Sequence, residues 1–204
     1  FKKFLPGAIG SGVTQINLLV ASIFASQIPG AISWLYYSDR VAQLPLGIIG
    51  IAIGTALLPD LAKKISLGQN KEQNIIQEKA ILLSLLFALP SAVALYYLSE
   101  LVISSLFGYG VFIKSDVTAT SNALKIYAIA IPAFMMIKVL SPNFFARKDT
   151  KTPVLIGTLC AFINIILTWY LMNKYGFVGI AISLCIAGYL NAILLFNIMI
   201  IRKY

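Results

Sequence analysis

Long stretches without a charged residue dominate this chain and limit what it can fold into. Among the runs that contain no Asp, Glu, Lys or Arg, six match predicted spans. They are Phe4–Ser38, Val41–Pro59, Ala80–Ser99, Ile126–Ile137, Thr152–Asn173 and Tyr175–Ile201. A helix needs roughly 20 apolar residues to cross the hydrocarbon core of a bilayer. Four of the runs reach that length, whereas Val41–Pro59 falls just short and Ile126–Ile137 is clearly shorter. Two of the helices must therefore take charged residues into or near the membrane.

The composition excludes a water-soluble domain. Hydrophobic residues make up 59% of the 204 residues, charged residues only 11%, and the mean hydropathy is +0.89. A soluble domain has about 45–50% apolar and about 25% charged residues. The apolar runs are also continuous, whereas the strands of a transmembrane barrel alternate over segments of about ten residues. We therefore predict an all-α, polytopic membrane helix bundle with about six transmembrane helices.

The charge-free runs and their flanks give the predicted spans, which together form a single transmembrane lobe over residues 1–204. The spans are residues 6–28, 33–60, 74–98, 118–142, 153–173 and 176–201. Residues 100–115 form an amphipathic outer loop, for which a short interfacial helix and a plain ordered loop are alternatives. Prolines inside or at the ends of spans predict kinks, because proline removes a backbone donor. These are Pro45, Pro90, Pro132 and Pro142.

The basic residues predict the orientation. With the N-terminus in the cytoplasm, eleven basic residues fall at cytoplasmic ends: Lys2, Lys3, Lys63, Lys64, Lys71, Lys79, Arg147, Lys148, Lys151, Arg202 and Lys203. The outer loops hold only Lys114 and Lys174. This bias places both ends of the chain in the cytoplasm. The net charge of +9 is spread over four separate edges, which argues against nucleic acid as a partner and favours contact with anionic membrane lipids.

No group of residues has the pattern of a catalytic or metal site. The chain has no histidine, and Cys160 and Cys185 sit inside apolar runs without metal-ligand spacing. The carboxylates Asp60, Glu72 and Asp149 lie at cytoplasmic edges. We expect no enzyme activity and no cofactor. Because the chain starts with Phe and has no signal peptide, we expect a piece of a longer protein.

The second span carries the most informative pattern, a stripe of polar residues and glycines at helical spacing. It consists of Ser33, Tyr36, Arg40, Gln43, Gly47, Gly50 and Gly54. Two alternatives remain for Asp39 and Arg40. If the helix begins near Arg40, the pair lies among lipid headgroups beside an aromatic belt. If it begins near Ser33, the pair lies in an outward-opening polar cavity, where an arginine binds phosphate or carboxylate.

Three further features bear on packing and on a pathway. Gly50 and Gly54 form a GxxxG pattern that favours close helix packing. Lys138, near the cytoplasmic end of the fourth span, either reaches the headgroups or lines a substrate pathway. The first span has a row of small and polar residues, Gly10, Thr14, Asn17 and Ala21. This row either makes hydrogen bonds between helices or lines a cavity.

Several motifs resemble the MurJ (MviN) family, flippases of the peptidoglycan precursor lipid II. The more specific ones are Ser33–Arg40, Leu44–Gly47, Gly50–Gly54 and Leu57–Pro59. Weaker ones are Gln15–Asn17, Phe24–Ser26, Leu89–Ala92, Phe107–Gly110, Lys138–Pro142 and Asp149–Pro153. The matches run in order along nearly the whole chain.

The resemblance implies one lobe of a two-lobed fold of fourteen transmembrane helices, with this chain as helices seven to twelve. It implies a bacterial inner-membrane location, lipid II as the substrate, and a first lobe that is missing here. Asp39 and Arg40 match a pair that the family places in its central cationic cavity. The implied substrate-binding residues are Arg40, Asp39, Ser33, Gln43 and Lys138. The family often has Glu where this chain has Gln43, which puts an ion-linked role of this position in doubt.

Two other functions remain as alternatives. A related exporter of drugs or of polyprenyl-linked oligosaccharides differs from a lipid II flippase in its cargo. A membrane scaffold for cell-wall synthesis enzymes would not need Asp39 and Arg40.

Overall fold

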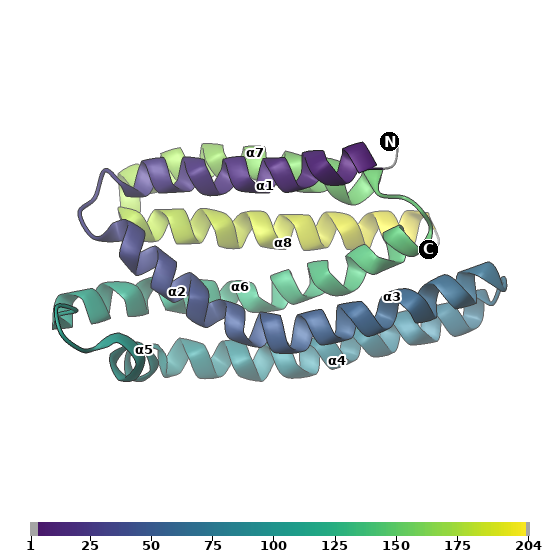
Figure 1. Ribbon diagram of the computed structural model, residues 1–204, viewed down its shortest axis with the longest axis horizontal. Helices are drawn as coiled ribbons and strands as arrows, with labels where there is room; N and C mark the ends of the chain where they lie inside the picture. Colours follow the sequence, from purple (N-terminus) through teal and green to yellow (C-terminus); the bar gives the residue numbers. More distant parts are fainter. Residues whose placement is uncertain (1–3, 203–204) are drawn as a thin grey trace.

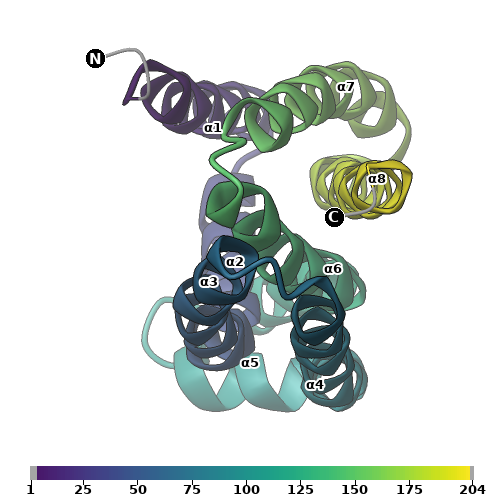
Figure 2. The ribbon, with the colours of Figure 1, turned by 90° about the vertical axis from the view of Figure 1, so that its right-hand side faces the viewer.

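The computed structural model describes residues 4–202, except for the side chains of residues 4–11, Thr14, Ile51, Gly54 and Asn70. Within this range the helices are α1 (Phe4–Ala25), α2 (Ala31–Pro45), a π-helical turn (Leu46–Gly50), α3 (Ile51–Ser66), α4 (Asn70–Tyr97), α5 (Ser99–Phe107), α6 (Lys114–Ala146), α7 (Lys151–Tyr175) and α8 (Phe177–Ile201). The helices run roughly lengthwise except α5, which lies across one end (Figure 1, Figure 2). The start of α1 and the end of α8 lie at the opposite end from α5 (Figure 1).

The bundle is organised around α6, which packs against α2, α3, α4, α5 and α8. Figure 2 shows α6 between α8 on one side and the α3–α4 pair on the other. Leu124, Ile131 and Met135 recur at helical spacing and are fully buried. Small residues on the same helix, such as Ala123 and Ala128, are also fully buried. Small side chains allow membrane helices to approach closely. The buried alanines therefore let neighbouring helices pack against α6, which forms the core of the lobe.

The prediction of an all-α membrane bundle is confirmed. Five helices of the described part are long and apolar enough to cross a membrane: Ala31–Ser66, Lys71–Tyr97, Lys114–Ala146, Lys151–Tyr175 and Phe177–Ile201. The first predicted span, residues 6–28, falls on α1, where the apolar stretch with described side chains is Gln15–Ala25. The earlier side chains of that span lie outside the described residues, so a sixth crossing stays a prediction. Of the two alternatives for residues 100–115, a helix does form, as α5.

The second span is one long helix interrupted by a π-helical turn. Pro45 ends α2, the wider turn covers Leu46–Gly50, and α3 continues from Ile51. Figure 1 shows that the direction of the helix changes between α2 and α3. A proline inside a helix removes one backbone hydrogen bond, and a π-helical turn accommodates the resulting misfit. The turn therefore separates α2, which carries Asp39 and Arg40, from α3, whose last turn carries Lys63 and Lys64.

Hydrogen bonds between polar side chains and neighbouring helices join α1, α6, α7 and α8. Asn164 donates to Asn17 at 3.0 Å, joining α7 to α1, and the hydroxyls of Thr168 and Ser183 are 2.7 Å apart, joining α7 to α8. The Tyr189 hydroxyl donates to the Ile129 carbonyl at 2.8 Å, joining α8 to α6. Since lipid offers these groups no partner, such bonds select one packing of the helices.

Removing the bond between α7 and α8 tests this role. Thr168→Val keeps the shape of the side chain but leaves the buried Ser183 hydroxyl without its partner on α7. We expect unfolding to become easier by about 0.5–1.5 kcal/mol, measured as a lower melting temperature of the purified protein in detergent. Thr158→Val is the control, because the Thr158 hydroxyl donates only within its own helix, to the Val154 carbonyl. Equal melting temperatures for both variants would contradict a stabilising role of the interhelix bond.

Candidate functional site

The start of α2 is anchored at the outer end of the bundle. Gly30 precedes the helix with a φ of +85°, a conformation that favours glycine, and the Trp34 ring packs over it. The Trp34 indole N–H donates to Asp116 Oδ1 at 2.8 Å, and the ring lies 5.0 Å from that of Phe177. These contacts tie α2 to the starts of α6 and α8. Because α2 begins at Ala31, the segment from Ser33 to Arg40 lies wholly within the helix.

The two faces of α2 differ in burial, and the apolar residues Ile32 and Leu44 are exposed along with its polar residues. The face against the rest of the bundle is buried and consists of Ala31, Leu35, Ser38, Val41 and Ala42. Ser33, Tyr36, Arg40, Gln43 and Gly47 are exposed. These five members of the predicted stripe therefore lie on a face that the described chain leaves uncovered, whereas Gly50 is buried. Gly54, the last member of the stripe, lies outside the described side chains.

Within the stripe, Asp39 and Arg40 have different partners. The Gln43 amide donates to Asp39 Oδ2, one helical turn away. The Arg40 guanidinium lies over the Tyr36 ring, 4.8 Å from its centre, also one turn away. The two side chains have separate contacts because consecutive residues of a helix point in different directions.

Lys138 lies on a different helix, α6, from the other predicted site residues. It is exposed on α6, and its aliphatic chain crosses Gly50, where an added Cβ would come within 2.9 Å of Lys138 Cδ. The close contact at Gly50 is therefore with a lysine side chain. Ten residues separate Gly50 from Arg40, which is about 15 Å at helical rise. The structure brings Ser33, Asp39, Arg40 and Gln43 together on α2 but places Lys138 apart from them.

Two cavities lie beside these helices. The smaller one, about 130 Å³, lies between α1, α2, α6 and α8, and Ser22, Tyr36 and Tyr127 are among its lining residues. Tyr36 thus belongs both to the stripe and to this cavity, so the stripe faces the side of α2 on which α1 lies. Tyr127 carried no signal in the sequence, because it sits in a charge-free run among apolar residues.

The larger cavity, about 500 Å³, lies between α1, α6, α7 and α8. Asn17, Asn164 and Asn191 contribute polar groups to a mostly apolar lining that also includes Cys160. Asn17 therefore fits both interpretations of the first-span row, since it bonds to Asn164 and lines a cavity. Gly10 and Thr14 of that row lie outside the described side chains. Cys160 and Cys185 are both buried and free, as small apolar core residues are.

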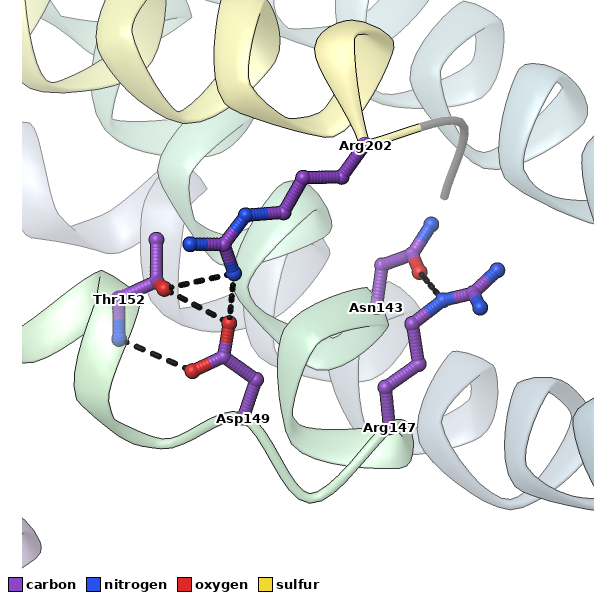
Figure 3. A network of polar contacts seen from close by, with 5 residues as sticks. All are labelled: Asn143, Arg147, Asp149, Thr152 and Arg202. Atoms are coloured by element: carbon purple, nitrogen blue, oxygen red, sulfur yellow. Dashed lines mark hydrogen bonds and ion pairs between the residues drawn. The ribbon is translucent and has the colours of Figure 1, made fainter.

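A third polar group joins the turn between α6 and α7 to the end of α8 (Figure 3). Asp149 accepts hydrogen bonds from the Thr152 backbone N–H at 3.1 Å and from the Thr152 hydroxyl at 2.7 Å, and it pairs with Arg202 at 2.6 Å. Asp149 thereby caps the start of α7 and ties it to the end of α8. Beside it, Arg147 donates to Asn143 at 3.2 Å and to Gln73 on α4 at 2.7 Å.

A profile of the family described as "Lipid II flippase MurJ" matches residues 1–203. The chain belongs to the lipid II flippase MurJ family. Among its relatives is "Probable lipid II flippase MurJ" of Rhizobium meliloti (strain 1021), 40% identical over 98% of this chain and 37% of the relative. Another is "Lipid II flippase MurJ" of Burkholderia cenocepacia, 32% identical over 95% of this chain and 38% of the relative. The chain thus spans about two fifths of the length of these relatives.

Solved structures agree with the MurJ family assignment. "Lipid II flippase MurJ, inward closed conformation" superposes with a TM-score of 0.87 at 30% identity, over 98% of this chain and 42% of that one. An outward-facing multidrug resistance MATE family transporter of the MOP superfamily superposes with a TM-score of 0.82 at 16% identity, over 98% of this chain and 44% of that one. The second likeness shows a shared fold alone.

The Asp149 group predicts a pH-dependent stability. Partial burial alone would raise the pKa of Asp149, but the bonds from Thr152 and the charge of Arg202 hold it below its usual value. A carboxylate with a lowered pKa stabilises the fold above its unfolded pKa of about 3.9 and loses that effect as the pH falls. We expect Asp149→Asn to cost about 1–2 kcal/mol at pH 7 and to flatten the loss of melting temperature between about pH 5 and pH 3.

The matched control for this prediction is Asp60→Asn, which changes an exposed carboxylate on α3. It should leave the pH profile of the melting temperature as in the parent protein. If Asp149→Asn and Asp60→Asn gave the same profile, the stabilising role of the Asp149 group would be refuted.

Proposed function

We propose that the chain is part of a lipid II flippase that moves the lipid-linked peptidoglycan precursor from the cytoplasmic to the outer leaflet. Membership of the MurJ family carries this proposal. The physical task is to move a pyrophosphate-linked disaccharide peptide through hydrocarbon, which is prohibitive for an unaided polyanion. A cavity with fixed cationic groups replaces the hydration of the pyrophosphate, while the lipid tail stays in the bilayer.

The stripe on α2 is the part of the chain that we assign to the substrate. Arg40 binds the pyrophosphate, since a guanidinium forms paired hydrogen bonds with phosphate oxygens. Asp39, Ser33 and Gln43 lie beside it on α2, and Lys138 provides a second cation about 15 Å further along the pathway. The uncovered position of the stripe supports this assignment, because a polar face of a membrane helix needs protein or water against it.

The remainder of the protein supplies the other wall of the cavity. The chain spans about two fifths of its relatives, and we propose that a first lobe faces the stripe of α2. Alternating access then arises when one lobe rocks against the other around the substrate. The helix-breaking turn between α2 and α3 and the core around α6 fit a lobe that moves largely as one body.

We propose that the protein lies in the bacterial inner membrane with both ends of this segment in the cytoplasm. The described basic residues support this orientation. Lys63 and Lys64 lie in the last turn of α3, Lys151 begins α7, and Arg202 follows α8. These helix termini lie at the end of the bundle where α1 begins (Figure 1). Lys114 begins α6 and Lys174 lies in the last turn of α7, at the other end. Basic residues favour the cytoplasmic side.

Arg40 provides the test of this function. In the full-length protein, Arg40→Ala should abolish the flipping of lipid II in reconstituted vesicles and fail to replace the wild-type protein in growing cells. Arg40→Lys keeps the charge but loses the paired geometry, so partial activity is expected. Lys114→Ala, which removes an exposed cation at the outer end, is the control and should be active. Full complementation by Arg40→Ala would contradict the site assignment.

The same experiments separate the alternatives. A membrane scaffold for cell-wall synthesis enzymes would tolerate the loss of both Asp39 and Arg40. An exporter of drugs or of other polyprenyl-linked oligosaccharides would bind those compounds in place of lipid II, which a binding comparison with the purified full-length protein detects.

A further inference from the structure

Two pairs of side chains lie next to each other on α2, and each pair spans one helical turn; Tyr36, Arg40 and Gln43 are exposed and Asp39 is half-buried. In one pair the Arg40 guanidinium lies over the Tyr36 ring, 4.8 Å from its centre. In the other pair the Gln43 amide donates to the Asp39 carboxylate. Among the described residues, the ion pairs are Lys64 with Glu72 and Arg202 with Asp149, so Asp39 and Arg40 do not form one.

We infer that Tyr36 is the positioning residue for Arg40 and that Gln43 gives Asp39 a hydrogen-bond partner other than Arg40. This inference rests on the proposed function of the α2 stripe. A planar guanidinium carries its five N–H donors in the plane of the group. When an aromatic ring covers its face, those donors stay available at the edge. The stacked arrangement therefore fixes the direction of Arg40 and presents its donors to a pyrophosphate.

An ion pair with Asp39 would have the opposite effect. A carboxylate takes the same paired N–H donors that a phosphate takes, so the substrate would first have to break the pair. The hydrogen bond from the Gln43 amide reduces this competition, because Asp39 Oδ2 already accepts it. Asp39 remains near enough to influence the charge of the site without occupying the edge of the guanidinium.

Tyr36 is itself held in place from the outer end of the bundle. Its ring meets that of Tyr37 edge-on at 5.8 Å. Tyr37 lies 4.6 Å from the ring of Phe107 and 5.8 Å from that of Phe112, which belong to the end of α5 and the loop after it. Aromatic pairs at these separations are favourable. A chain of aromatic contacts thus connects α5 to the ring beneath Arg40.

A double-mutant cycle in the full-length protein tests the inference, with the dissociation constant for lipid II in nanodiscs as the readout. Tyr36→Leu removes the ring and should weaken binding about threefold to fivefold, with an unchanged melting temperature. Tyr36→Phe keeps the ring and should bind like the parent protein. Tyr170→Leu, at an exposed tyrosine on α7, is the matched control and should also bind like the parent.

The decisive comparison is made in the Arg40→Ala background. If Tyr36 acts through Arg40, adding Tyr36→Leu there should change the dissociation constant no further. An equal weakening in both backgrounds, a wild-type constant for Tyr36→Leu, or a loss by Tyr36→Phe as large as that of Tyr36→Leu would each overturn the inference. An unchanged constant for Arg40→Ala alone would instead refute the proposed substrate role of Arg40, so the two failures are distinguishable.

Discussion

Hydrocarbon gives polar groups no hydrogen-bonding partner, and this constraint bears on every polar side chain of a membrane-spanning helix. Asn17, Asn164, Thr168 and Ser183 satisfy it by pairing with one another between helices. The stripe on α2 does not, because its polar side chains lie on a face that the described chain leaves uncovered. An uncovered polar face on a membrane helix requires a hydrated or protein-lined space beside it. The proposed transport pathway follows from this requirement.

The lobe has a packed core around α6 and exposed polar residues on α2. Fully buried α6 residues hold α2, α3, α4 and α8 together, and the Asp149 group joins the α6–α7 turn to the end of α8. On α2 the anchor at Trp34 and the π-helical turn after Pro45 bracket the charged residues. Asp39 and Arg40 therefore lie on a helix that is fixed at its outer end, near Trp34, and interrupted after Pro45.

The sequence predicted an all-α membrane bundle, because long charge-free runs are typical of helices that cross hydrocarbon. It also predicted the α2 stripe, since helical periodicity alone determines which residues share a face. It did not predict the partners of Asp39 and Arg40, because those depend on side-chain rotamers. Nor did it predict the Asn17–Asn164 bond or the position of Tyr127 at a cavity, since both arise from packing between helices distant in sequence.

The central claim is that the α2 stripe faces water and substrate rather than lipid, and thiol accessibility in the full-length protein measures this most directly. Cys160 and Cys185 are first replaced by alanine, and Gln43→Cys or Phe162→Cys is introduced, the latter at an exposed apolar position on α7. The prediction is that a membrane-impermeant, water-soluble thiol reagent modifies Gln43→Cys, that lipid II slows this reaction, and that Phe162→Cys stays unmodified. A Gln43→Cys thiol as unreactive as the one at position 162 would contradict it.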